Sequence, residues 1–215
     1  MTRGERLLEL VTVMDRLRSP GGCPWDAEQT HASLVQYLVE ETYETVEAID
    51  ADDRDAMVEE LGDLLLQVVF HARIGQEADQ PFDIDDVAGG IAEKLVARHP
   101  HVFGDATADT AEDVEASWFE RKRREKGRTS VTDGVPMAMP AIPLIEKLLH
   151  RAAKGGVAAP PPDPRLAMLL DEMDVGDAIL NLVAAAQARG IDADAAARGA
   201  AHRLRADLLA AETPG

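Results

Sequence analysis

The chain has 215 residues, enough for one large domain or two small ones, and its 46% hydrophobic content is ordinary for a folded protein. Its formal net charge of -18, from 22 basic and 40 acidic residues, excludes general binding to nucleic-acid backbones or anionic membranes, which require a cationic footprint. A single cysteine, Cys23, excludes an internal disulfide framework, and with no signal-peptide pattern or apolar run of about 18 residues we expect a cytoplasmic protein.

Helices are the predicted elements throughout, because Ala, Leu, Glu, Asp and Arg recur while only 4% of residues are aromatic. We therefore predict an all-α fold. Apolar periodicity and turn signals predict five helices in chain order. The first ends before SPGG at 19–22, the second covers about 31–49 with Thr30 as N-cap, and the third runs from near Asp53 to near Gly75. The fourth is capped by Asp83 or Asp85 and ends before Pro100, and the fifth covers 110–126. The segment HVFGDAT after Pro100 is predicted to be a loop.

The organisation predicted from these elements has three parts. Residues 1–127 form a bundle of four to five helices, and residues 128–165 form a linker rich in Pro and Gly with one short helix near 143–153. Residues 166–215, with a helix near 192–210, look like a faded copy of residues 57–98, because both stretches place an acid-x-Gly-Asp step before an apolar run.

Carboxylates recur at helical spacing in EETYE at 40–44 and in EELGD at 59–63. Residues three apart on a helix share a face, so Glu41 and Glu44 point the same way, as do Glu60 and Asp63. Two such helices packed antiparallel would present four convergent carboxylates, and burying an unpaired carboxylate is unfavourable. The sequence therefore predicts a cation between the two helices.

The predicted cation is Mg²⁺, with Mn²⁺ as the alternative, because a ligand set made only of oxygen selects hard cations. The competing interpretation is that both segments are ordinary solvated helix faces. Asp63 argues against that interpretation, because a largely apolar run follows it. Gly62 argues the same way, because a glycine inside a helix costs about 1 kcal/mol relative to alanine and is explained where backbones come close.

The two acidic segments resemble the EExxE and ExxD motifs of the all-α nucleoside triphosphate pyrophosphohydrolases, and neighbouring strings narrow the resemblance to the MazG family. The strings occur in order and at fitting distances: GGCPWDAEQTH at 21–31, EETYETVEAID at 40–50, ELGDLLLQVVFHA at 60–72 and KLVARHPHVFGD at 94–105. A set of this kind is far more specific than one ExxE, and the resemblance covers about residues 3–126.

By this resemblance, Glu41, Glu44, Glu60 and Asp63 hold Mg²⁺, and Glu40 assists with a second ion or orients water. The implied reaction is hydrolysis of a nucleoside triphosphate, NTP or dNTP, to the monophosphate and pyrophosphate, in house-cleaning of the nucleotide pool. This chemistry fits the carboxylates, because metal ions neutralise the phosphates and also activate water.

The resemblance also implies that four further residues bind the substrate. Lys94 and Arg98 match the KxxxR position of the family, and Trp118, with Lys122 one turn later, matches an aromatic position near the base. An exposed Trp can stack on any nucleobase. From the residues alone, Lys94 and Arg98 are equally explained as a basic helix end favoured by the helix dipole, and Trp118 as a packed core anchor.

The second half departs from the family pattern. DVGD retains Asp174 and Asp177, but GGVAAPPPDP stands where a helix carrying EExxE is expected, so we predict that residues 166–212 are catalytically inactive. Their apolar faces should pack on the first domain or across a dimer; the residues concerned are Leu166, Leu169, Leu170, Ile179, Leu180 and Val183. A catalytic unit of this superfamily is usually completed by another copy, so a homodimer is expected.

Two other classes of protein compete with this interpretation. A di-iron carboxylate bundle would also use Glu from facing helices, but it requires Glu-x-x-His, which occurs here only from Glu28 to His31 at a loop-to-helix junction. A non-enzymatic acidic helical module that docks a basic partner would need no metal, and it leaves Asp63 unexplained.

Overall fold

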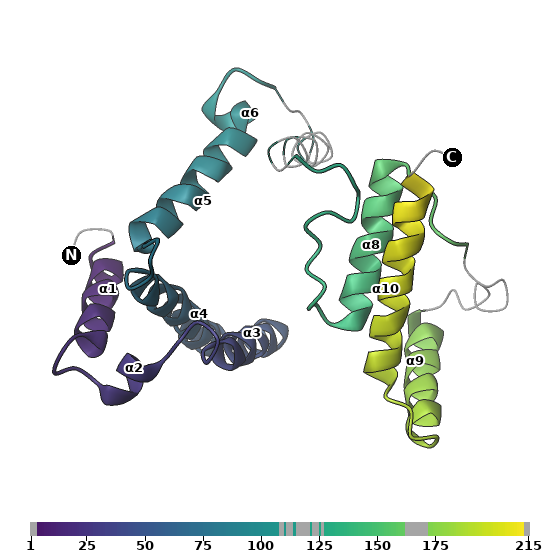
Figure 1. Cartoon of the computed structure of the whole chain (residues 1–215), viewed down its shortest axis with the longest axis horizontal. Coiled ribbons are helices and arrows are strands. Elements are labelled where there is room, and N and C mark those ends of the chain that lie inside the picture. Colours follow the sequence, from purple (N-terminus) through teal and green to yellow (C-terminus); the bar gives the residue numbers. More distant parts are fainter. Residues whose placement is uncertain are drawn as a thin grey trace. The chain divides into compact units, whose positions relative to one another are not determined.

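The computed structural model describes residues 4–107, 110, 114, 121, 125, 127–161 and 172–212. Over these residues every regular element is an α-helix, so the predicted all-α class is confirmed (Figure 1). The contacts divide the chain into two compact units, Met1–Ala108 and Asp109–Gly215. The three predicted parts, 1–127, 128–165 and 166–215, stay a prediction.

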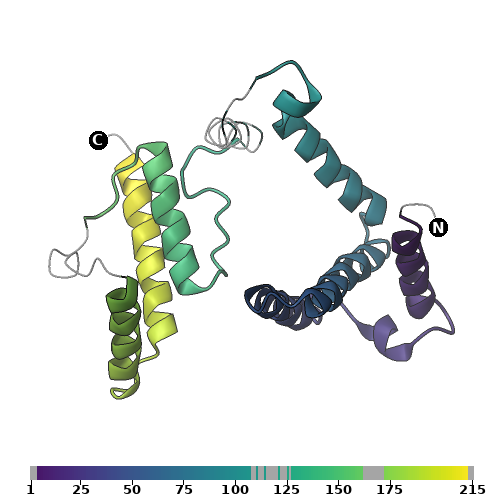
Figure 2. The same ribbon diagram turned by 180° about the vertical axis from the view of Figure 1, so that it is seen from behind.

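The first unit is built around a helical hairpin, with shorter helices around it. Its helices are α1 (Glu5–Arg18), α2 (Pro24–Glu28), α3 (Val35–Asp50), α4 (Arg54–Gly75), α5 (Ile84–Arg98) and α6 (Pro100–Phe103). α3 and α4 pack along each other, and both views of the ribbon place them side by side (Figure 1, Figure 2).

A short turn joins α3 to α4 and makes them antiparallel. Asp52 in this turn adopts φ 52°, which is the left-handed region. Asp53 then caps α4, because its side chain accepts hydrogen bonds from the backbone N–H groups of Asp55 and Ala56. The predicted limits of α4, near Asp53 and near Gly75, are confirmed.

The core of the first unit lies where α1 and the start of α3 meet the C-terminal half of α4. Its buried residues are Met14, Leu34, Val69, Phe70 and Ile74. α4 ends at Gly75, which lies against the ring of Phe82. The ring leaves no room for a side chain at this position, because a Cβ at Gly75 would lie 2.6 Å from Phe82 Cζ. The hairpin is thus held by hydrophobic packing at one end, and its carboxylate-bearing part lies beyond that core.

Asp83 caps α5 and forms a capping box with Asp86, so the first of the two predicted caps is confirmed. Other local predictions were wrong. Thr30 does not cap a helix beginning at His31, because Thr30 and Ser33 bond each other's backbone N–H groups in a turn and α3 begins at Val35. Pro100 ends α5 as predicted but then occupies the first position of α6, where its missing N–H is not needed, so part of the predicted loop is helical.

The second unit contains α8 (Ala141–Gly155), α9 (Glu172–Gln187) and α10 (Ala193–Glu212). α8 and α10 pack along each other, and the buried residues between them are Val135, Leu144, Leu148, Ala152, Ala201 and Leu208. Both predicted helices, 143–153 and 192–210, are confirmed within this pair. The predicted helix over 110–126 falls largely outside the described residues.

Polar contacts fix the direction of α8 relative to α10. Arg198, near the start of α10, donates to the carbonyl oxygen of Met139, just before α8, and the backbone N–H of Val131 donates to Glu212 at the end of α10. Arg151, near the end of α8, donates to the carbonyl oxygens of Val131 and Asp133. The two helices therefore run parallel.

The apolar residues predicted to need a partner in the second unit are exposed where they are described. Ile179, Leu180 and Val183 on α9 are 42%, 66% and 44% exposed. Leu166, Leu169 and Leu170 lie outside the described residues. Among the described helices, none combines the length and the apolar character that crossing a membrane requires.

Candidate metal centre

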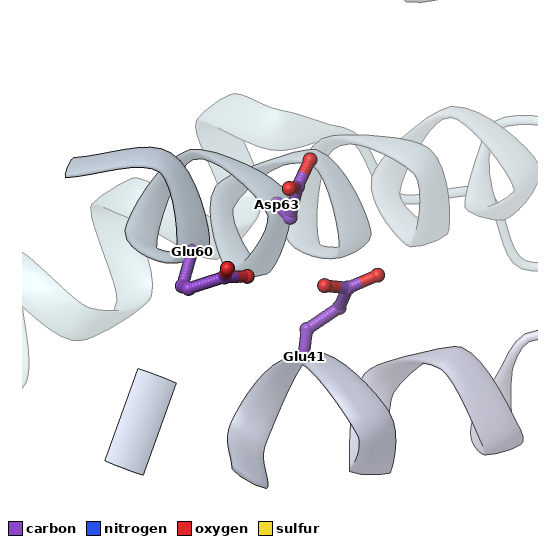
Figure 3. A group of neighbouring side chains, drawn as sticks. All are labelled: Glu41, Glu60 and Asp63. Carbon is purple, nitrogen blue, oxygen red and sulfur yellow. The ribbon is translucent and has the colours of Figure 1, made fainter. Parts of the chain in front are cut away.

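Three carboxylates meet at the seam between α3 and α4. Glu41 projects from α3, and Glu60 and Asp63 project from α4 three residues apart (Figure 3). One oxygen of each lies within 4.8 Å of one oxygen of the others, and all three residues are half-buried. The predicted sharing of a face between the two helices is therefore realised for these three side chains.

The electrostatic state of this cluster is that of crowded acids. Burial raises the pKa of Glu41 above its ordinary value, and Asp63 and Glu44 raise it further by charge repulsion and, for Glu44, by a side-chain hydrogen bond. Burial, followed by the charge of Glu44, likewise raises the pKa of Glu60. Burial and like-charge repulsion both disfavour the ionised forms, so a cation placed among these oxygens would relieve the repulsion and favour the charged carboxylates.

Glu44 and Glu40 lie beside this group and not within it. Glu44 is exposed, one turn after Glu41 on the same face of α3, and it acts electrostatically on both Glu41 and Glu60. Glu40 is exposed on α3 and is not part of the group of converging oxygens. The structure thus brings together three of the four predicted ligands, with the fourth next to them.

The remaining predicted site residues lie elsewhere. Lys94 is half-buried on α5, and Arg98 at the end of α5 is 5% exposed. α5 leaves the hairpin at the end of α4, and both views place its far end away from α3 (Figure 1, Figure 2). Trp118 and Lys122 fall outside the described residues.

Asp177 is exposed on α9, and the side chain of Asp174 falls outside the described residues. Over the part of the chain that the structure describes, Glu41, Glu60 and Asp63 form the one group of acids, His or Cys with metal-ligand spacing. Gly62 does not mark a close approach of two backbones within the described residues, contrary to the prediction, because an added Cβ would meet no atom within 4 Å outside its own helix.

The sequence interpretation assigned no role to His31 and His71, which the fold brings together. Their Nδ1 atoms are 2.7 Å apart, although His31 precedes α3 and His71 is near the end of α4. Gln67, one turn before His71, is 5% exposed. A signal for these residues was present in the sequence, because Asp63, Gln67 and His71 follow one another at four-residue spacing inside an otherwise apolar run.

The donor set fits a hard divalent cation. Ligand oxygens at about 2.1 Å from one Mg²⁺ lie at most about 4.2 Å apart, so the observed group needs only small side-chain rotations to bind one ion. Nitrogen and sulfur ligands, which zinc sites use, are absent from the group. Paired helices that present carboxylates across their seam define an all-α protein with a group of acids that could hold a metal ion and serve phosphate chemistry.

Comparison with known proteins agrees with this class. Residues 29–103 match the model of the MazG nucleotide pyrophosphohydrolase domain, a range that contains all four predicted metal ligands. A relative from Thermotoga maritima called nucleoside triphosphate pyrophosphohydrolase/pyrophosphatase MazG is 37% identical over 91% of this chain and 81% of its own length. The chain belongs to the MazG family.

Two other relatives differ in how much of their own length this chain covers. An uncharacterised 26.1 kDa protein in the blaB 3' region of Streptomyces cacaoi is 54% identical over 97% of this chain and 84% of its own length. A nucleoside triphosphate pyrophosphohydrolase of Mycobacterium tuberculosis is 49% identical over 73% of this chain, but the aligned part is only 48% of that relative. This chain thus spans about half the length of the second relative.

Proposed function

We propose that the chain hydrolyses nucleoside triphosphates, NTP or dNTP, to the nucleoside monophosphate and pyrophosphate, with Mg²⁺ or, alternatively, Mn²⁺ as cofactor. The observation that carries the proposal is the convergence of Glu41, Glu60 and Asp63 within 4.8 Å. Three acids in this arrangement are unfavourable without a cation, and the family to which the chain belongs uses nucleotides as substrates. House-cleaning of the nucleotide pool in the cytoplasm is the role that we propose.

Each carboxylate has a stated task in this reaction. Glu41, Glu60 and Asp63 would hold the cation together with Glu44 beside them, and Glu40 would assist with a second ion or orient the attacking water by accepting its hydrogen bond at a carboxylate oxygen. The ion held by these carboxylates would supply positive charge that neutralises the phosphate oxygens and favours the departure of pyrophosphate. Without it, the acids of the hairpin would repel a triphosphate. One water is consumed, and its oxygen ends on the α-phosphate of the monophosphate.

The proposal includes a homodimer, supported by apolar side chains that the single chain leaves exposed on three helices of the first unit. These are Val39, Tyr43 and Val46 on α3, Val58, Leu61 and Leu65 on α4, and Ile91, Leu95 and Val96 on α5. Over the described residues, the buried cluster at the centre of the same unit has only five members. A second copy packed on these faces would bury them, and Lys94 on its own α5 would then contribute to binding the triphosphate at the carboxylates of the first.

The test is product analysis with the full chain and a panel of NTPs and dNTPs, with and without Mg²⁺. Monophosphate and pyrophosphate should appear only with the metal. Glu41→Gln and Asp63→Asn should lose turnover, whereas Asp177→Asn, an acid of the second unit, should retain it. Release of diphosphate and phosphate, or equal activity in all three variants, would contradict the proposal.

Oligomeric state is tested separately by light scattering on the purified protein. The wild-type chain should have the mass of a dimer. Leu65→Glu places a charge on the exposed face of α4 and should yield monomers, whereas Leu180→Glu on α9 should not. A wild-type monomer, or dissociation by Leu180→Glu alone, would contradict the dimer described above.

A further inference from the structure

Two buried side-chain atoms on α4 have no hydrogen-bond partner, and they lie one turn apart. Among the described side chains these atoms are Gln67 Oε1 and His71 Nε2. A buried polar atom without a partner costs about 1–3 kcal/mol, so two neighbouring ones need an explanation. The two are chemically complementary, because an amide oxygen accepts a hydrogen bond and an imidazole nitrogen that carries a proton donates one.

The contact between His31 and His71 determines which nitrogen of His71 can carry that proton. The Nδ1 atoms are 2.7 Å apart, the rings are 2° from parallel and their centres are 5.0 Å apart. With the two Nδ1 atoms this close, the ring centres can be this far apart only if both nitrogens lie on the line that joins the centres. The rings therefore lie edge to edge in one plane and are not stacked face to face. One Nδ1 therefore donates and the other accepts.

If His31 Nδ1–H is the donor, His71 accepts at Nδ1 and carries its proton at Nε2, toward the turn that holds Gln67. The opposite arrangement would leave His71 Nε2 as a bare buried acceptor and Gln67 Oε1 still without a donor. Burial, and then the charge of His31, lower the pKa of His71, so its ring is neutral near pH 7. The first arrangement satisfies both orphan atoms with one hydrogen bond.

We propose that Gln67 is a positioning residue for Asp63, because it accepts a hydrogen bond from His71 Nε2–H at its Oε1 and donates from its Nε2 to the Asp63 carboxylate. Asp63, Gln67 and His71 are spaced four residues apart on α4, which is the spacing at which Gln and Asp side chains bond on a helix. The inference rests on the proposed function, in which Asp63 holds the metal.

The consequence is a hydrogen-bonded chain that runs from His31 through His71 and Gln67 to Asp63. Gln67 is 5% exposed, so packing restricts its rotation. The proposal requires its amide group to turn so that both hydrogen bonds form. A fixed donor on one carboxylate oxygen of Asp63 would leave the other oxygen directed at the cation. Partners of this kind typically contribute 10–100-fold to metal affinity.

The first test needs no metal and no activity. Nitrogen-15 spectra of the histidine rings in the wild-type chain, with His71 assigned by the His71→Asn variant, should show the proton of His71 on Nε2. In Gln67→Met, which keeps the size but removes the acceptor, the proton should move to Nδ1. The matched control Gln76→Met, at an exposed position just after α4, should leave the spectrum unchanged. A proton on Nδ1 in the wild type would overturn the proposal.

The second test measures Mn²⁺ affinity by electron paramagnetic resonance. Gln67→Met should bind about tenfold more weakly than the wild type, and Gln76→Met should bind equally well. Equal affinity in all three proteins would overturn the positioning role even where Gln67→Met unfolds more easily. A wild-type chain that binds neither Mn²⁺ nor Mg²⁺ would instead refute the proposed metal site. In that case the nitrogen spectra would still show whether His71 donates its Nε2 proton to Gln67.

Discussion

Replacing Glu41 by Gln removes one negative charge from the seam between α3 and α4 while keeping the size of the side chain. Burial raises the pKa of Glu41 most, and Asp63, Glu44 and Glu60 raise it further by charge repulsion. Without a divalent cation, the substitution should therefore stabilise the first unit. In the presence of Mg²⁺ the order should reverse, because the wild-type chain binds the ion and the variant has lost a ligand.

The expected magnitudes are small but measurable. Like-charge pairs on helix surfaces cost about 0.2–0.5 kcal/mol each, and the half-exposed position of Glu41 screens them, so three pairs amount to about 1 kcal/mol at low salt. In a domain of about 100 residues this corresponds to a rise in Tm of about 4 °C. Mg²⁺ at a hundred times its Kd should stabilise the wild type by about 2.7 kcal/mol.

Thermal unfolding followed by circular dichroism in low salt with chelator, and again with Mg²⁺, measures both effects. In about 1 M NaCl, the stabilisation of Glu41→Gln over the wild type that is expected in chelator should disappear. The reason is that the Debye length falls to about 3 Å, so the carboxylates no longer repel each other strongly. Two results would refute the reasoning about mutual repulsion. One is a Glu41→Gln variant with a lower Tm than the wild type in chelator, and the other is a variant whose Tm rises with Mg²⁺ as much as that of the wild type.

Acidification through the ordinary pKa of histidine, about 6.5, should destabilise the first unit, because burial, and then the charge of His31, lower the pKa of His71 and the unfolded chain therefore binds more protons. Urea unfolding should show the lower free energy of unfolding, and His71→Phe should reduce this loss. Gly75→Ala should lower the unfolding free energy by about 1–3 kcal/mol in the same assay, and by less when Phe82 is Leu. Asp52→Gly should raise it by about 0.5 kcal/mol, because glycine adopts the left-handed conformation more readily.

Periodicity and capping residues were enough to predict most helices of this chain. Asp53 and Asp83 marked the starts of α4 and α5 because a side-chain acceptor next to free backbone N–H groups acts locally. Thr30 misled for the same reason: a hydroxyl can also close a turn with a neighbour, as it does with Ser33. The sequence alone does not decide between these two local uses.

The candidate site was predictable as far as it depends on helical spacing. Glu41, Glu60 and Asp63 converge because three-residue spacing fixes their faces and a short turn makes the helices antiparallel. The contact of His31 with His71 was not predictable, because it depends on where the chain before α3 returns to the end of α4. No close approach of backbones explains Gly62, because over the described residues an added Cβ would meet no atom within 4 Å outside its own helix.

The three converging carboxylates all come from residues 41–63, in one hairpin closed by a short turn. Contacts between neighbours in sequence form quickly, since little loop-closure entropy is lost. We therefore expect the carboxylates to come together early in folding, before α5 is in place. A divalent ion present at this stage would accelerate folding, and the more charge repulsion between the carboxylates it removes, the larger the acceleration.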